Sequence, residues 1–206
     1  MTEATAEELG QHIASSFMSL ADVLDGSSLW DAASMCEGWR VREVVAHVTM
    51  AARYDEASFM SMLQEDGFDF TRLSNRVAAA DAQLPDATLL ANLRDPALHA
   101  WVPPGGGTLG ALNHIVIHGL DVTGANELAR VASEPALRVV LDDLTHGGVA
   151  REFGVDVTGT SLRATDIDWS FGSAGDAITA TAGDLVLHLA ARRVPPNRLS
   201  TTISRT

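Results

Sequence analysis

Apolar residues recur at helical spacing through most of the first half of the chain. In residues 3–25 they follow one another at steps of three or four: Leu9, Ile13, Phe17, Leu20 and Leu24. Gly26 comes next and is a typical stop signal. The pattern predicts an amphipathic helix whose apolar face packs against other helices.

A second helix is predicted to start near Arg40 and to end at Gly67, with an apolar stripe made of Val41, Val44, Val45, Val48 and Ala52. On a helical wheel, four residues lie beside this stripe: His47, Ala51, Tyr54 and Ser58. His47 is therefore expected to face the interior of a helical bundle. Taken alone, it is either a hydrogen-bonded core histidine or a metal ligand.

The next stretch carries weaker signals. Residues 72–83 and 86–93 are predicted to form short helices, and Asp95-Pro96 interrupts any continuation. Residues 102–107, VPPGGG, form a loop. This loop lacks the Gly-Lys-Ser/Thr sequence of a phosphate-binding loop, so its glycines are read as turn residues.

Residues 107–126, GTLGALNHIVIHGLDVTGAN, carry the clearest chemical signal. They contain no Lys, Arg or Glu and a single Asp, so a helix here is predicted to be buried on nearly all sides. His114 and His118 stand four residues apart and project from one face of that helix. Two adjacent buried imidazoles are either hydrogen-bonded core residues or the paired ligands of a metal.

After Asn126 the pattern changes. Residues 135–152 predict a further helix, and short β-like runs follow at residues 155–157, 161–165, 167–171 and 177–181. A last helix is predicted over residues 185–192, ended by Pro195-Pro196. The predicted fold class is α+β: an N-terminal helical bundle over residues 1–130 and a small C-terminal α/β domain over residues 131–206, with the boundary near residues 128–134.

Composition narrows the classes of partner. The 206 residues contain no apolar run near the roughly 18 residues of a membrane span. The N-terminus lacks the basic and apolar regions of a signal peptide, and one cysteine excludes an intrachain disulfide, so a soluble cytoplasmic protein is expected. A formal net charge of −13 disfavours nucleic acid and anionic membranes as partners.

Four phrases resemble the mycothiol-dependent maleylpyruvate isomerase family. MCEGWRVREVVAHVTM, residues 35–50, is similar to that family's signature, close to C-P-G-W-T/S-V-R-D-V-V-A-H-L. HIVIHGLDV, residues 114–122, is similar to its E/H-x-x-x-H-x-x-D helix. RATDIDWSFGS, residues 163–173, and DLVLHLAARR, residues 184–193, look like its closing domain. The resemblance covers about residues 5–193.

The resemblance implies a DinB-like four-helix bundle followed by a small α/β domain. It also implies a divalent metal, usually taken as zinc, held by His47, His114 and His118. Three neutral imidazoles leave a fourth coordination position open, as in catalytic zinc sites. The implied activity is that of an enzyme that uses mycothiol as thiol co-substrate and acts on an electrophilic substrate, by isomerisation or S-transfer. The contrasting hypothesis is a non-catalytic metal-binding module, such as a sensor or carrier.

Further roles follow from the same comparison of motifs. His114 stands where the isomerase proper has Glu, so the site loses a negative charge and its substrate stays open. Three roles are open for Asp121: a hydrogen-bond partner of a metal ligand, a general acid or base, or a residue that interacts with the end of the helix. Arg192 matches an arginine thought to hold a substrate carboxylate, although arginines at a helix end are also common on surfaces. Cys36 is either a packing residue or a reactive thiol near a helix N-terminus.

Overall fold

The computed structural model describes residues 4–103, 105–173 and 176–202. Its main helices are α1 (Ala6–Leu24), α2 (Val41–Val48), α3 (Glu56–Glu65), α4 (Phe70–Asp81), α5 (Asp86–Leu93), α6 (Ala97–Ala100), α7 (Gly107–Ala125), α8 (Glu134–Thr145) and α9 (Ala182–Leu189). Short 3-10 turns lie at Leu29–Asp31, Met50–Ala52, Val149–Phe153 and Pro196–Arg198. The strands are β1 (Ser161–Ala164), β2 (Ser170–Phe171), β3 (Ala177–Ala180) and β4 (Ser200–Thr202).

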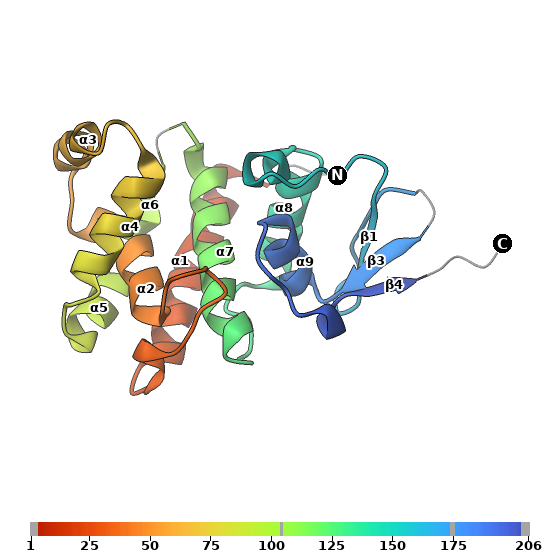
Figure 1. The fold of residues 1–206 in the computed structure, drawn as a ribbon, viewed down its shortest axis with the longest axis horizontal. Helices are drawn as coiled ribbons and strands as arrows, with labels where there is room; N and C mark the ends of the chain where they lie inside the picture. The colour runs from red at the N-terminus through yellow and green to blue at the C-terminus, as the bar shows by residue number, and fades with distance from the viewer. Residues whose placement is uncertain (1–3, 104, 174–175, 203–206) are drawn as a thin grey trace.

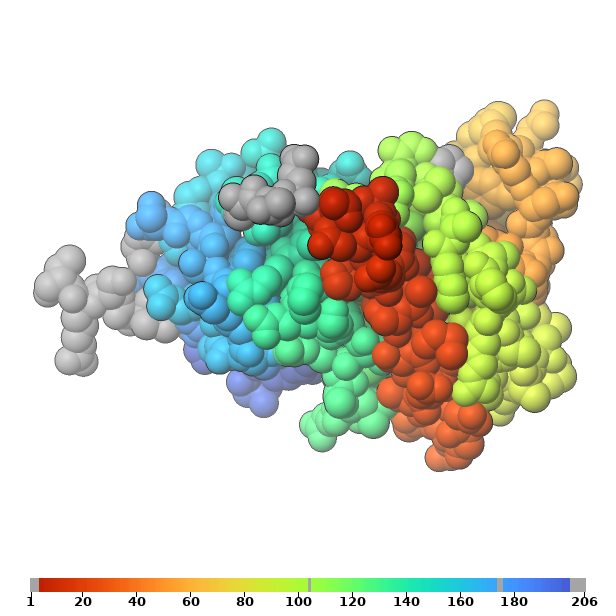
Figure 2. Space-filling view, turned by 180° about the vertical axis from the view of Figure 1, so that it is seen from behind, coloured from red at the N-terminus to blue at the C-terminus, as the bar shows by residue number. Residues whose placement is uncertain are grey.

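Helix α7 stands in the middle of the molecule. It packs against α1 and α2 on one side and against α8 and α9 on the other (Figure 1). Figure 2 shows α1 running along the opposite face of the molecule from that of Figure 1. Leu112, Ile115, Val116 and Val122 of α7 are fully buried, which confirms that this helix is enclosed on nearly all sides. Over the described residues, no helix is both long and apolar enough to cross a bilayer.

The four strands form one small sheet in the order β2-β1-β3-β4. β1 and β3 are parallel, with Leu162 opposite Ile178, and the two outer strands run antiparallel to them. Helix α9 covers β1 and β3 and packs on α8. The α+β class with a helical N-terminal part is confirmed. The core is continuous from α1 to α9, and both the four-helix bundle and the division at residue 130 stay predictions.

The predicted helix from Arg40 to Gly67 is wrong, because the chain forms two helices there. Helix α2 ends at Val48, and the Arg53 guanidinium folds back to donate hydrogen bonds to the carbonyls of Ala46 and Thr49. These bonds satisfy acceptors that a continuing helix would have used. Asp55 then starts α3 by accepting a hydrogen bond from the Ser58 backbone N–H at 2.8 Å. Contrary to the prediction, Tyr54 and Ser58 therefore do not lie on the same helix as His47.

The C-terminal half also differs from its prediction. The helix expected to reach residue 152 ends at Thr145, because Gly148 takes a left-handed conformation (φ 78°) and a 3-10 turn follows. Residues 155–157 form no strand, and the run at 167–171 pairs only at its last two residues. The last helix ends at Leu189, with Ala191 at a φ of 58° soon after it. Strand β4 was not predicted.

Close packing around α7 gives a stability prediction. A Cβ atom added at Gly119 would lie 2.7 Å from Cγ2 of Val131, whose branched side chain has little rotamer freedom. Gly119→Ala is expected to lower the free energy of unfolding by about 1–2 kcal/mol, because overpacking outweighs the roughly 1 kcal/mol gained in helix propensity. Urea unfolding would measure the change.

Gly10→Ala provides the matched control for that substitution. Gly10 lies within α1, and a Cβ atom there would meet no atom within 4 Å. It is expected to raise the free energy of unfolding by up to about 1 kcal/mol. Equal effects at the two glycines would contradict the close approach of Val131 to α7.

Candidate functional site

Three histidines converge where α2 meets α7. His47 lies in the last turn of α2 and is 6% exposed, whereas His114 and His118 come from successive turns of α7. One nitrogen from each ring can be chosen so that all three lie within 4.8 Å of one another. The Nε2 atoms of His47 and His114 are 2.9 Å apart. Among the described residues, this is the one group of at least three His, Cys, Asp or Glu side chains that could hold a metal ion.

Burial keeps two of these imidazoles neutral. Desolvation, together with the neighbouring His114, His118 and Arg192 side chains, lowers the pKa of His47 well below its ordinary value. Desolvation and His118 lower the pKa of His114 to about 3. The Nδ1 atoms of both rings are buried without a hydrogen-bond partner. Neutral imidazole is the form that binds a metal, so the site is set for coordination at neutral pH.

His118 has a carboxylate partner. Its Nδ1 lies 2.9 Å from Oδ2 of Asp121, and Arg192 donates to both oxygens of the same carboxylate at 2.8 and 3.0 Å. Burial would raise the pKa of Asp121, but the hydrogen bonds from His118 and Arg192 outweigh it and hold the pKa below its usual value. Asp121 therefore stays ionised, and it fixes the His118 ring with Nε2 free of that contact.

The loop before α2 is tied to α7 at the same place. The Met35 backbone N–H donates to the carbonyl of Asp121 at 2.8 Å. This contact brings Trp39 over the histidines: its ring centroid lies 5.0 Å from that of His47 and 6.2 Å from that of His118. The Trp39 indole N–H donates to the Asn75 side chain of α4 at 2.9 Å. Nothing in the spacing of the sequence indicated that Trp39 would contact the histidines.

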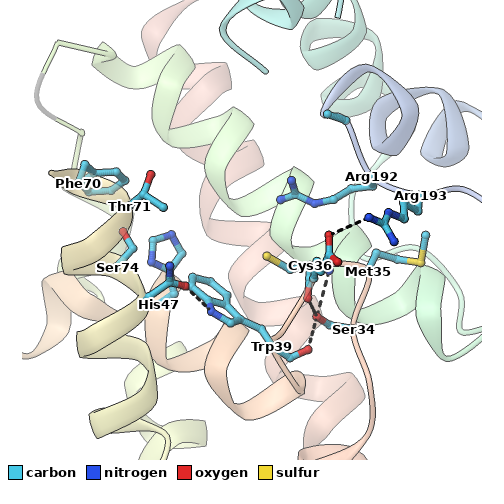
Figure 3. A pocket seen from close by; sticks show the side chains of 13 residues that line it. Ser34, Met35, Cys36, Trp39, His47, Phe70, Thr71, Ser74, Arg192 and Arg193 are labelled. Atoms are coloured by element: carbon cyan, nitrogen blue, oxygen red, sulfur yellow. Dashed lines mark hydrogen bonds and ion pairs between the residues drawn. The ribbon is translucent and has the colours of Figure 1, made fainter. Parts of the chain in front are cut away.

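A cavity of about 630 Å³, here called the polar cavity, opens beside His47. Its lining comes from the residue 34–39 loop, α4 and the segment after α9: Ser34, Met35, Cys36, Glu37, Trp39, His47, Phe70, Thr71, Ser74, Asn75, Ala191, Arg192 and Arg193. Figure 3 shows Trp39 and Cys36 lying between His47 on one side and the two arginines on the other. Arg192 lines this cavity, but its guanidinium is paired with Asp121, and its role in holding a substrate carboxylate stays a prediction.

The thiol of Cys36 lies in this wall. Burial and the nearby Asp121 carboxylate raise its pKa to about 11, against which Arg192 acts more weakly. The thiolate form needed for nucleophilic attack is therefore scarce at neutral pH. The packing interpretation of Cys36 is the one that its surroundings favour.

A second cavity of about 620 Å³, here called the aromatic cavity, meets the histidines from another side. Its lining includes His47 and His114, the segment that follows the break after α2, and the segment before α7. The residues are His47, Val48, Met50, Ala51, Tyr54, Asp55, Glu56, Phe59, Phe70, Ala100, Trp101, Val102, Pro103, Gly105, Gly107 and His114. The Trp101 ring centroid lies 5.5 Å from that of His114. Nothing in the spacing of these residues indicated a cavity, because the break in the helix was not foreseen.

Comparison with known proteins gives a family and a fold. Residues 11–123 match the model of the mycothiol maleylpyruvate isomerase N-terminal domain. The fold is similar to the crystal structure of the mycothiol-dependent maleylpyruvate isomerase (TM-score 0.60) and to that of a histidine-to-alanine mutant (TM-score 0.58). Each is 16% identical and the alignment covers 100% of this chain and 98% of that one. No curated protein matches the chain. Since the matched domain spans more than half of the sequence, the chain belongs to the mycothiol maleylpyruvate isomerase family.

Proposed function

We propose that the protein is a metal-dependent enzyme that activates mycothiol for attack on an electrophilic small molecule. The observation that carries the proposal is the convergence of His47, His114 and His118 on one point, with His47 lining two cavities and His114 one of them. Membership of the isomerase family supports mycothiol as the thiol.

The donor set fits a divalent metal such as zinc. His47, His114 and His118 would hold it through neutral ring nitrogens, and Asp121 supplies the carboxylate that such sites commonly place behind one ligand. When bound, a divalent metal favours the thiolate form of a coordinated thiol at neutral pH. With His114 where the isomerase has Glu, three neutral ligands leave the full positive charge of the ion to attract a thiolate.

The remaining residues position the His118 ring and shield the histidine cluster from water. Asp121 orients the His118 ring, and Arg192 balances the charge of Asp121 so that the carboxylate can stay ionised while it is completely buried. Trp39 covers His47 and His118 and keeps part of the histidine cluster out of water. A thiol placed in the polar cavity reaches the cluster along Trp39 and Cys36 (Figure 3).

Two reactions are compatible with this arrangement. In an isomerisation, the thiolate sulfur adds to one carbon of a cis double bond, the single bond that results rotates, and the thiolate leaves again. In an S-transfer, the sulfur forms a bond to carbon and the leaving group departs with the electron pair. Membership of the family favours isomerisation. His114, which stands where the isomerase has Glu, keeps S-transfer as the second candidate reaction.

Cobalt substitution tests thiol dependence. Addition of mycothiol to the cobalt form is expected to produce a charge-transfer band from sulfur to metal, at a pH well below the pKa of the free thiol. The band should disappear in acid, because each imidazole must be neutral to hold the metal. Absorption spectroscopy with increasing mycothiol measures it.

The Cys36→Ser variant is the control for that experiment. If the added thiol is the source of the band, the band should persist in the variant, since that chain contains no cysteine of its own. A cobalt form whose spectrum does not respond to saturating mycothiol at neutral pH would favour the non-catalytic metal-binding module.

A further inference from the structure

The two cavities beside His47 differ in chemistry although they are similar in size. The polar cavity holds Arg192, Arg193 and several hydroxyl and amide groups. The aromatic cavity is walled mainly by rings and aliphatic groups, among them Tyr54, Phe59 and Trp101. A ligand that spans the histidine cluster would therefore meet a polar wall at one end and an apolar wall at the other.

Charge separates the cavities further. Among the described residues that line the aromatic cavity there is no Lys or Arg, whereas Asp55 and Glu56 both lie at its edge. Asp55 caps α3, so the pKa of its carboxyl is lowered by hydrogen bonds from Ser58, and the group stays ionised. A carboxylate ligand in this cavity would find two like charges and no Lys or Arg among the described lining residues, and the open position of the proposed metal is the one assigned above to the thiol.

The aromatic cavity also borders the histidine cluster. His47 and His114 belong to its lining, and Trp101 lies against the His114 ring. His47 lines the polar cavity as well. A molecule in the aromatic cavity and a thiol in the polar cavity would thus approach the same histidine cluster from different sides.

We propose that the aromatic cavity binds the electrophile, and that this electrophile is an uncharged molecule with an apolar or aromatic body rather than a small dicarboxylate. The inference rests on the proposed function and assigns its substrate class. Apolar area buried against Phe59, Trp101 and Val102 drives binding, and stacking on aromatic rings favours a flat group. The exposed carboxylates of Asp55 and Glu56 weaken the binding of anions of the same shape.

Two small probes of matched shape test whether the aromatic cavity prefers an uncharged ligand to an anion. Benzylacetone is neutral, and hydrocinnamate has a carboxylate oxygen where benzylacetone has its methyl group. Neither is an electrophile that would label thiols. On the purified full chain, with a chelator present so that no ion offers the carboxylate a ligand position, equilibrium dialysis is expected to show benzylacetone binding at least about tenfold more tightly than hydrocinnamate. Equal or tighter binding of hydrocinnamate, or no binding of benzylacetone, overturns the proposal.

Substitutions in each cavity test which of the two binds benzylacetone. Val102→Asp introduces a charge at an exposed position of the aromatic cavity and is expected to weaken benzylacetone binding about tenfold or more. Thr71→Asp places the same charge in the polar cavity, near the start of α4, and should leave binding within about twofold. Should Val102→Asp fail to fold by circular dichroism, Ala100→Asp tests the same wall at another exposed position. Equal effects in the two cavities would refute the assignment.

Charge reversal at the edge gives an independent measurement. Glu56→Lys, at an exposed residue, is expected to raise the affinity for hydrocinnamate severalfold and to leave benzylacetone binding within about twofold. Because these experiments measure binding without thiol or turnover, they can fail while the cobalt band appears. They can equally succeed while that band is absent, so the two proposals fail separately.

Discussion

Replacing His118 by alanine is expected to remove the metal from the purified protein, reducing it from about one ion per chain to a small fraction of that. Two imidazoles would remain, at His47 and His114. Neither ring has a hydrogen-bond partner for its Nδ1 atom, whereas His118 is held by Asp121 at 2.9 Å. The substitution therefore removes the best oriented of the three donors. Elemental analysis of the protein as isolated would measure the loss.

Two further variants sharpen this experiment. His146→Ala changes an exposed histidine that contacts Phe171, away from the cluster, and should leave the metal content unchanged. Asp121→Asn keeps all three ligands but loses the charge behind His118, so metal affinity should fall by about 10–100-fold. Unchanged metal content in His118→Ala would show that the site lies elsewhere.

The metal-free chain is expected to lose stability as the pH falls below about 6.5. In the folded state His47 and His114 resist protonation, since burial lowers the pKa of both and that of His114 falls to about 3. In the unfolded state both take up protons near their ordinary pKa. The unfolded state then binds more protons, so the free energy of unfolding decreases with falling pH, by about 1.4 kcal/mol per pH unit for each ring.

Urea unfolding at about pH 7.5 and about pH 5.5, with a chelator present, should therefore differ by about 3 kcal/mol. Most carboxylates stay ionised over this window, so they contribute little. The double variant His47→Gln, His114→Gln lacks both rings but keeps His188, whose pKa is also lowered by burial. Its pH dependence should be weaker by most of that difference. An unchanged dependence would mean that the two rings accept protons in the folded state.

The sequence was most informative where burial and spacing agreed. A stretch of 20 residues with no Lys, Arg or Glu must be buried, and two histidines four residues apart on it must share a face. Both statements hold for α7. His47 joined this pair through resemblance alone, since its position on a helix did not say which neighbouring helix it would meet.

What could not be foreseen depended on long side chains and distant contacts. The residues after Val48 still show a helical pattern, and the helix stops because Arg53 folds back onto it and pairs with Asp81 of α4. The pairing of Arg192 with Asp121 joins residues 71 positions apart. Strand β4 is short and polar and pairs at one edge of the sheet, so periodicity gave no sign of it.

The end of α2 at Val48 separates the candidate metal ligands from the segment that lines the aromatic cavity. The segment 50–59 contributes six residues to the aromatic cavity but supplies none of the three histidines, so it can vary while α2 and α7, which carry the candidate metal ligands, stay as they are. We expect relatives that differ in this segment to share metal content and to diverge in the molecules they accept. Exchanging residues 50–59 between two such relatives should move ligand preference with the segment, which makes it a natural target for engineering a new substrate range.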